Sequence, residues 1–273
     1  MLAARDSMLS IQTLNLVNSL AGLGVGVIVG LTGVGGGSLM APIMVLIFGV
    51  APATAVGTDL WFAAITKIFG GWIHGKKGTI DWQILRRMFA GSLPAAALTL
   101  LWLYESGMGQ SKSGLMVKAL GCTLILSSFA ALFRTRFHAI GEKIRGTRPV
   151  QFKAMQPALT VVAGLILGFL VTVTSIGAGA LGAVMLLYLY PRRLTPSSLV
   201  GTDIVHAIPL TILAGTGHLL MGNVDYNLLG NLLIGSIPGI VFGSLAAVYA
   251  PAAIIRTAIA VVLALVGLKM VSA

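Results

Sequence analysis

The chain alternates between long apolar runs and short polar breaks over almost its whole length. A helix needs about 20 apolar residues to cross a bilayer, and most of the runs approach or exceed that length. The runs cover 11–31, 38–50, 52–74, 82–104 and 113–133, and then 157–173, 180–190, 196–221, 224–249 and 252–271. The second run of each series is too short to cross, so we expect it to enter the membrane only part of the way.

The order of the runs repeats because the chain contains an internal duplication. Residues 31–59 read LTGVGGGSLMAPIMVLIFGVAPATAVGTD, and residues 175–203 read SIGAGALGAVMLLYLYPRRLTPSSLVGTD, 144 positions later. The same separation aligns Gly91-Ser92-Leu93-Pro94 with Gly235-Ser236-Ile237-Pro238 without a gap. Self-similarity over this length predicts two structural copies. We expect membrane repeats over 1–133 and 157–273, joined by a basic cytoplasmic linker over 134–156 that is the only substantial soluble segment.

Composition places the chain in the membrane. Hydrophobic residues make up 57% of it and charged residues only 9%, with a mean hydropathy of +0.98. A soluble domain cannot bury that fraction of apolar surface. The net charge of +11 does not indicate nucleic-acid binding, because the cations lie in short loops between apolar runs. Such loops mark the cytoplasmic side of a membrane protein.

The positions of the basic loops predict how the two copies insert. In the first copy Lys76 and Lys77 follow the V-G-T-D helix, whereas in the second Arg192 and Arg193 precede it. The charge therefore changes ends between equivalent helices, as it does when two repeats insert upside down relative to each other. We expect an all-α polytopic protein of the bacterial inner membrane with two inverted-topology repeats. Each repeat has a glycine-broken helix pair followed by three transmembrane helices.

The glycine-rich breaks are the first candidate site. A helix interrupted at membrane depth exposes main-chain N–H and C=O groups that must face protein or a wet cavity, and successive free N–H groups bind anions. The opposing interpretation is that the glycines only let helices pack closely. The predicted substrate-binding residues of the breaks are Thr32, Gly35, Gly36, Gly37 and Ser38 in the first copy, and Thr174, Ser175, Gly177 and Gly179 in the second.

Ionisable residues inside the apolar runs are the second candidate site, because a charge at membrane depth is costly and by default functional. Asp59 and Asp203 end the two V-G-T-D sequences. They either couple transport to protons or hold the glycine breaks by accepting hydrogen bonds. His206 shares a helix face with Asp203 and titrates near neutral pH. We expect Thr58, Thr202 and Lys67 to join the substrate site, with Lys67 as the partner of an anion.

Other groups are given lesser roles. His74 and His218 lie at predicted helix ends and are expected at the membrane interface. No His, Cys or carboxylate spacing matches a zinc site, so we predict no metal, and no cofactor or ATP-binding motif is found.

The motifs, taken in order, resemble a known family. TGVGGGS, two V-G-T-D helices, G-T-I-D-W answered by G-N-V-D-Y, and two G-S-x-P turns are similar to those of the TauE/SafE family of sulfite and organosulfonate permeases. The resemblance implies a multi-pass inner-membrane protein that moves sulfite, organosulfonates or thiosulfate, with the two breaks and the two Gly-Thr-Asp helices lining the path. The second break, TSIGAG, has fewer glycines than the first, so the two halves are not expected to bind identically.

The sequence therefore predicts a secondary transporter that moves a small anion by alternating access, driven by an ion or substrate gradient. A passive anion channel of the same fold is the first alternative. An intramembrane hydrolase using Ser175 or Ser38 with His206 is the second, although neither serine sits in a Gly-x-Ser-x-Gly elbow. A membrane scaffold is the third. The expected partners are the anionic substrate and lipid, and no nucleic acid; the oligomeric state stays open, a homodimer included.

Overall fold

The computed structural model describes residues 15–32, 37–107, 113–147, 149–246 and 252–272. Over these residues the fold is all-helical. The helices are α2 (Leu16–Thr32), α3 (Gly37–Leu46), α4 (Pro52–Lys76), α5 (Trp82–Glu105), α7 (Ser113–Leu132), α8 (Arg134–Thr147), α9 (Pro149–Thr174), α10 (Ala180–Leu189), α11 (Pro196–Leu220), α12 (Tyr226–Ala246) and α13 (Ala252–Ser272). Most of these bounds follow the predicted runs. Prolines begin α4 and α11, at a position where the main-chain N–H that proline lacks would have no partner within the helix. Asp81 caps α5 by accepting a hydrogen bond from the N–H of Ile84.

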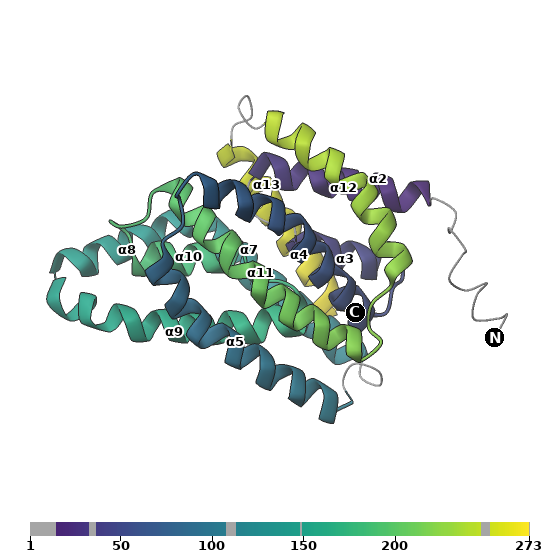
Figure 1. The fold of residues 1–273 in the computed structure, drawn as a ribbon, viewed down its shortest axis with the longest axis horizontal. Helices are drawn as coiled ribbons and strands as arrows, with labels where there is room; N and C mark the ends of the chain where they lie inside the picture. The colour runs from purple at the N-terminus through teal and green to yellow at the C-terminus, as the bar shows by residue number, and fades with distance from the viewer. Residues whose placement is uncertain (1–14, 33–36, 108–112, 148, 247–251, 273) are drawn as a thin grey trace.

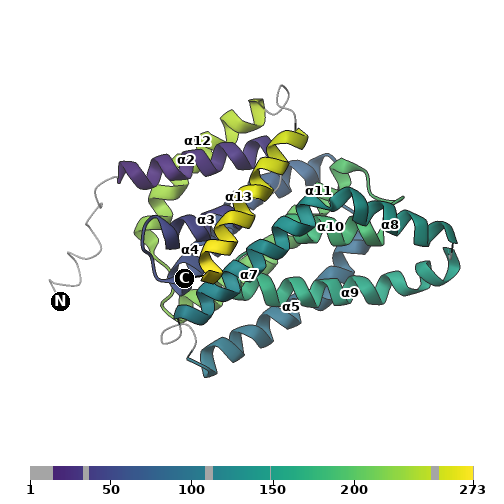
Figure 2. The same cartoon turned by 180° about the vertical axis from the view of Figure 1, so that it is seen from behind.

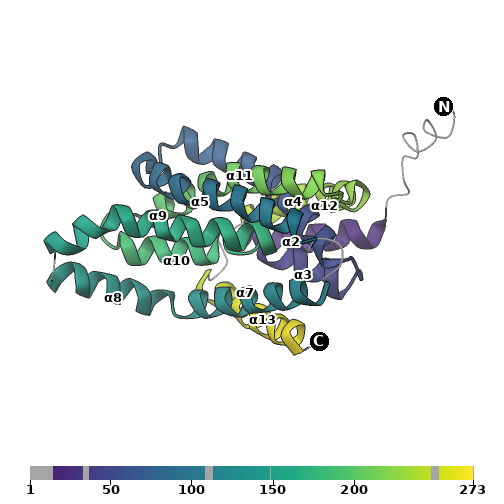
Figure 3. The same ribbon diagram turned by 90° about the horizontal axis from the view of Figure 1, so that it is seen from below.

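Helices from the two halves pack against each other throughout the molecule. In Figure 1, α4 and α11 lie in the middle, α2 and α12 pack together on one side, and α5 and α9 on the other. The pair α7 and α13 crosses behind them, as Figure 2 shows from the opposite face. The short helices α3 and α10 lie between these layers (Figure 3), where α3 contacts α4 and α13 and α10 contacts α11 and α7.

The central helices α4 and α11 run antiparallel. Gly57, near the start of α4, lies against His218 at the end of α11, and Gly201, near the start of α11, lies against His74 at the end of α4. Between these contacts, Gly215 faces Trp61. Small residues at the crossing let the two backbones approach, as is usual for helix pairs in membranes.

The flanking pairs use glycine in the same way. A Cβ at Gly22 of α2 would meet the main chain of Leu232 in α12, and a Cβ at Gly91 of α5 would meet the main chain of Val161 in α9. Each of these pairs joins a helix from the first half to a helix from the second. The halves are therefore interlocked rather than side by side.

The surface and the helix lengths fit a membrane protein. Five described helices are long and apolar enough to span a bilayer. These are Trp82–Glu105, Gly114–Leu132, Pro149–Thr174, Pro196–Leu220 and Tyr226–Gly243, with shorter apolar helices over Leu16–Leu31, Ala180–Leu189 and Thr257–Ser272. Large apolar side chains such as Leu98, Phe242 and Leu265 are exposed on their outer faces. Such a surface is unsuited to water and suited to lipid.

The predicted linker contains a helix, and one predicted helix start differs. The stretch 134–147, within the segment expected as a basic cytoplasmic linker, is helix α8, and it packs on α10 where Gly141 meets the main chain of Tyr188. Helix α9 begins at Pro149 rather than at residue 157, because Pro149 takes the first helical position and Pro157 is tolerated inside the helix. A basic, polar segment can therefore form a helix when one of its faces packs on a neighbour.

The two G-S-x-P sequences are also not turns. They lie inside α5 and α12, with Pro94 and Pro238 as interior prolines. A proline removes one main-chain hydrogen bond, and membrane helices tolerate this when neighbouring helices cover the gap. In the structure α9 packs closely on α5 at Gly91, and α2 packs closely on α12 at Gly235.

The basic loops gather at one end of the molecule. The guanidinium of Arg193 binds the Asp81 carboxylate, with Nε 2.6 Å from Oδ2, so the α10–α11 loop meets the start of α5. His138 of α8 contacts the Pro191 carbonyl through Nε2 at 3.1 Å. We call this region, with Lys76, Lys77, Arg86, Arg87, Arg192, Arg193 and helix α8, the basic end. The fold thus brings these basic loops together.

Candidate functional site

The second glycine break is an unwound segment between α9 and α10. Helix α9 ends at Thr174 and α10 begins at Ala180. Gly177 and Gly179 have φ angles of +128° and +119°, which favour glycine, and Ser175 has a φ of +59°. The Thr174 hydroxyl donates to the Leu170 carbonyl at 2.6 Å and accepts from the N–H of Ile176 at 3.2 Å, so it stabilises the turn out of α9.

The first break is largely beyond the described structure. Gly35 and Gly36 lie outside the described residues, and so do the side chains of Thr32 and Ser38. The main chain places Thr32 at the end of α2 and Gly37 at the start of α3. Its role in binding therefore stays a prediction.

Six buried polar residues gather where α4, α5, α11 and the second break meet. We call them the central polar cluster: Asp59, Lys67, Ser92, Ser175, Asp203 and His206. All are at most 6% exposed. Five of the six were predicted, and the fold brings them together from four segments far apart in sequence.

Lys67 is the cation of this cluster. It is 6% exposed and lies within electrostatic range of both carboxylates, Asp203 and Asp59. Neither carboxylate comes within the 4.0 Å of a direct salt bridge. Buried charges are expensive unless paired and hydrogen-bonded. Opposite charges that are near each other without direct contact neutralise each other only in part.

Both carboxylates lie beside the second glycine break. Asp203 faces the main chain of Gly179, and its Oδ1 lies against Gly182 at the start of α10. Asp59 faces the Ser175 side chain and the main chain of Ala41. Among the described residues, neither oxygen of Asp59, nor Oδ1 of Asp203, has a hydrogen-bond partner at bonding distance.

His206 and Ser92 form a buried contact that sequence reasoning missed. The Ser92 Oγ and His206 Nε2 are 2.9 Å apart, and both residues are fully buried. The other ring nitrogen of His206, Nδ1, has no partner. The available signal was the duplicated G-S-x-P sequence, which marks Ser92 and Ser236 as equivalent positions of two helices that cross the membrane.

Thr58 and Thr202 do not face the cluster. The Thr58 hydroxyl accepts from the main-chain N–H of Asp225 at 3.0 Å, and the Thr202 hydroxyl accepts from the N–H of Asp81 at the same distance. Each bond joins one central helix to the start of a helix from the other half. These threonines join the two halves of the chain. The sequence had predicted a contact with substrate for them, and not this role.

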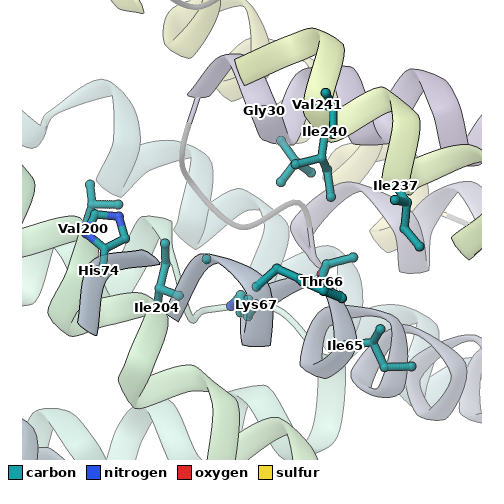
Figure 4. A pocket seen from close by; sticks show the side chains of 13 residues that line it. Gly30, Ile65, Thr66, Lys67, His74, Val200, Ile204, Ile237, Ile240 and Val241 are labelled. Carbon is teal, nitrogen blue, oxygen red and sulfur yellow. The ribbon is translucent and has the colours of Figure 1, made fainter. Parts of the chain in front are cut away.

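A cavity of about 390 Å³ reaches Lys67 from the side of α2, α4, α11 and α12. Its walls are mostly apolar, with Ile204, Ile237 and Ile240 among them. Figure 4 shows Lys67 between His74, Val200 and Ile204 on one side and Thr66 and Ile65 on the other. A small solute in this cavity would meet apolar walls and one cation.

The two histidines at the helix ends are covered to different extents. His218, in the last turn of α11, is fully buried, and its Nε2 lies 2.9 Å from the Thr172 carbonyl. The expected position of both histidines at the membrane interface stays a prediction. His74 is partly buried and contacts the Thr79 hydroxyl through Nδ1 at 2.8 Å. Among the described residues, no group of three His, Cys, Asp or Glu side chains comes together that could hold a metal.

Comparison with known proteins assigns the chain to a family. The family described as "Sulfite exporter TauE/SafE" matches residues 19–270. The chain belongs to the TauE/SafE sulfite exporter family. It is therefore a membrane transporter and not an enzyme.

Family relatives carry names of the same kind. The chain is 40% identical over 231 residues, 82% of its length and 87% of the relative's, to the "Probable membrane transporter protein YjnA" of Bacillus subtilis. It is 28% identical over 255 residues, 90% and 95% of the two chains, to YdhB of the same organism. It is also 28% identical over 215 residues, 76% and 72%, to MJ0441 of Methanocaldococcus jannaschii; both are named probable membrane transporter proteins. No solved structure gives a significant match.

Proposed function

We propose that this TauE/SafE protein is a secondary transporter of the bacterial inner membrane that binds a small sulfur-containing anion at the central polar cluster. Sulfite, organosulfonates and thiosulfate are the proposed class. The observation that carries the proposal is Lys67, a buried cation that borders a cavity and makes no direct salt bridge with Asp59 or Asp203. A bound anion would complete its electrostatic environment.

The mechanism rests on two inverted repeats, over 1–133 and 157–273. The antiparallel course of α4 and α11 supports this arrangement, because these helices are equivalent in the duplication. The paired bonds of Thr58 with Asp225 and of Thr202 with Asp81 support it as well, since exchange of the two halves turns one bond into the other. In such transporters the halves rock around a site at the bilayer centre to expose it alternately on each side.

The cluster also contains groups suited to coupling. Asp59 lies near Lys67 and, within the described part of the chain, has no hydrogen-bond partner at bonding distance, so a proton on Asp59 would change the charge that the anion meets. We assign proton coupling to Asp59 first. Asp203, which also lies near Lys67, and His206, which contacts Ser92, are the other candidates. The main-chain groups of the glycine breaks would add hydrogen bonds to the anion.

A thermal-shift screen of the purified protein tests the substrate class, with sulfite, thiosulfate, sulfate, sulfoacetate, taurine and simple carboxylates as probes. We expect sulfur oxyanions to raise the melting temperature, and Lys67→Met to abolish that rise while the protein stays folded. The matched control is Lys118→Met, which removes an exposed lysine of α7. Full retention of anion-dependent stabilisation in Lys67→Met would overturn the assignment of Lys67.

Flux measurements distinguish a transporter from a passive channel. In proteoliposomes we expect uptake of the stabilising anion to respond to an imposed proton gradient, and Asp59→Asn to remove that response. Anion flux that follows only its own concentration gradient would favour a channel of the same fold.

A further inference from the structure

A second charged cavity lies at the basic end, separate from the central polar cluster. Its volume is about 280 Å³. Four cations line it: Arg145 at the end of α8, Lys153 at the start of α9, and Arg192 and Arg193 in the α10–α11 loop. No carboxylate is among its lining residues. The junction of α8 with α9 and the α10–α11 loop thus line one cavity with positive charge.

The frame of this cavity is held by hydrogen bonds. The Tyr190 hydroxyl accepts from Arg87 at 3.1 Å and bonds the Thr160 hydroxyl at 2.7 Å. The Gln156 amide donates to the Leu189 carbonyl at 2.5 Å, which ties α9 to the end of α10. These bonds fix the main chain from which the cations extend, and a preformed frame lowers the entropic cost of binding.

Most of the positive charge in the cavity is not neutralised. Arg193 is paired with Asp81 and also donates to Gln83 at 2.8 Å. Arg145 donates only to the Pro149 carbonyl, at 3.1 Å. Arg192 reaches across to α8, with one guanidinium nitrogen 3.9 Å from the place of a Cβ at Gly146. Within the described part of the chain, Arg145, Lys153 and Arg192 have no carboxylate partner, and like charges held together are unfavourable until an anion joins them.

We propose that this cavity binds the phosphate group of an anionic phospholipid in the cytoplasmic leaflet. Arginine forks and a lysine ammonium are the groups that recognise phosphate, and basic pockets between membrane helices on the cytoplasmic side bind lipid head groups. The proposal is independent of the transported substrate. It uses only the basic end, which short Lys-rich and Arg-rich loops assign to the cytoplasm.

The depth of the cavity favours lipid over a dissolved anion. Helix α9 has 26 residues, so it is about 39 Å long and exceeds the hydrocarbon thickness of about 30 Å. Its first turns, which include Lys153, therefore reach the head-group layer. Val150 and Met155 on the same turns are 80% and 55% exposed, as expected for side chains that meet lipid rather than water.

Lipid binding by the full-length protein, purified in detergent and stripped of lipid, tests the proposal. Native mass spectrometry and melting temperature would be measured with phosphatidylglycerol, phosphatidylcholine and inorganic phosphate. We expect phosphatidylglycerol to bind and raise the melting temperature, with little effect of the other two. Arg192→Gln and Lys153→Gln should each weaken its binding about fivefold, and the double variant about 25-fold, from the usual contribution of one cation near an anionic surface. Arg86→Gln, an exposed arginine of the same end that does not line the cavity, should bind as the unaltered protein does.

Three outcomes would overturn the proposal. Equal binding of phosphatidylglycerol by the double variant would show that the cavity is not its site. Equal effects of phosphatidylcholine would show that charge is not recognised. Equal stabilisation by inorganic phosphate would show that the site takes a dissolved anion instead of a lipid. Arg192 and Lys153 are exposed, so their replacement should not prevent folding, and the elution profile of each variant in gel filtration checks this.

Discussion

Helices α4 and α11 occupy corresponding places in the two halves, and the way each is fixed is nearly the same. Thr58 and Thr202 make equivalent bonds of 3.0 Å to the start of a helix in the other half. Gly57 and Gly201 face the equivalent histidines His218 and His74. The frame that holds the two helices is therefore close to symmetric.

The polar groups carried by that frame are not symmetric. Lys67 of α4 corresponds to Thr211 of α11, and His206 of α11 corresponds to Phe62 of α4. Ser92 bonds His206, whereas its counterpart Ser236 reaches, among the described residues, only the carbonyl of Leu233, at 3.4 Å. The comparison teaches that a nearly symmetric frame can carry an asymmetric set of polar groups.

Replacing the crossing glycines should give the largest difference between the two helices. A Cβ at Gly57 would collide with the main-chain carbonyl of Asn223, which cannot move without the helix end. A Cβ at Gly201 would meet the side chains of Thr79 and His74, which can rotate. We expect Gly57→Ala to lower the free energy of unfolding by about 3 kcal/mol and Gly201→Ala by about 1 kcal/mol. Unfolding in dodecyl sulfate mixed micelles measures both, and equal losses would show that the crossing is more symmetric than described.

The contact between His206 and Ser92 should give the next largest effect. Ser92→Ala leaves the buried Nε2 of His206 without its partner, which costs about 1–3 kcal/mol. His206→Phe, which copies the residue of the first half, should cost less when combined with Ser92→Ala than when the two single losses are added. The coupling from this double-mutant cycle should be about 1 kcal/mol.

Ser236→Ala is the matched control for that cycle. Its hydroxyl has only a long contact with a carbonyl in its own helix, so its removal should change the free energy of unfolding by less than about 0.5 kcal/mol. A loss as large as that of Ser92→Ala would mean that buried serines matter at this depth whatever their partner.

Most helix bounds could be predicted, because length, apolar runs and prolines act locally. Pro52 and Pro196 begin α4 and α11 as expected. The helical form of 134–147 could not be predicted, since it depends on the packing of Gly141 against α10, a contact between distant segments. Composition records how polar a segment is, but not which neighbour covers it.

The candidate site was predictable in its charges and not in its contacts. Asp59, Asp203, Lys67 and His206 were recognisable because ionisable residues are costly in an apolar run. Nothing local distinguishes Ser92, a common small residue in a helix, from a serine that bonds its own main chain. Its partner lies 114 positions away, so only the fold reveals the pair.

Removing the Thr58 and Thr202 hydroxyls should give the smallest difference in unfolding free energy between the two halves. This comparison is therefore the most sensitive test of the symmetry of the frame. Valine keeps the shape of threonine but removes the hydroxyl, so Thr58→Val should cost about 1 kcal/mol of unfolding free energy. Thr202→Val should cost about 0.5 kcal/mol less than Thr58→Val. The Thr202 hydroxyl bonds the N–H of Asp81, and the ion pair of Arg193 with the Asp81 carboxylate continues to hold this residue when the hydroxyl is removed. An exposed ion pair contributes about that much free energy. In an Arg193→Gln background, which removes this second support, the Thr202→Val loss should rise to match that of Thr58→Val. Unfolding titrations of Thr58→Val, Thr202→Val, Arg193→Gln and the Thr202→Val/Arg193→Gln double variant measure these losses. An unchanged difference between the two threonine losses would mean that something other than the ion pair distinguishes the two threonine bonds.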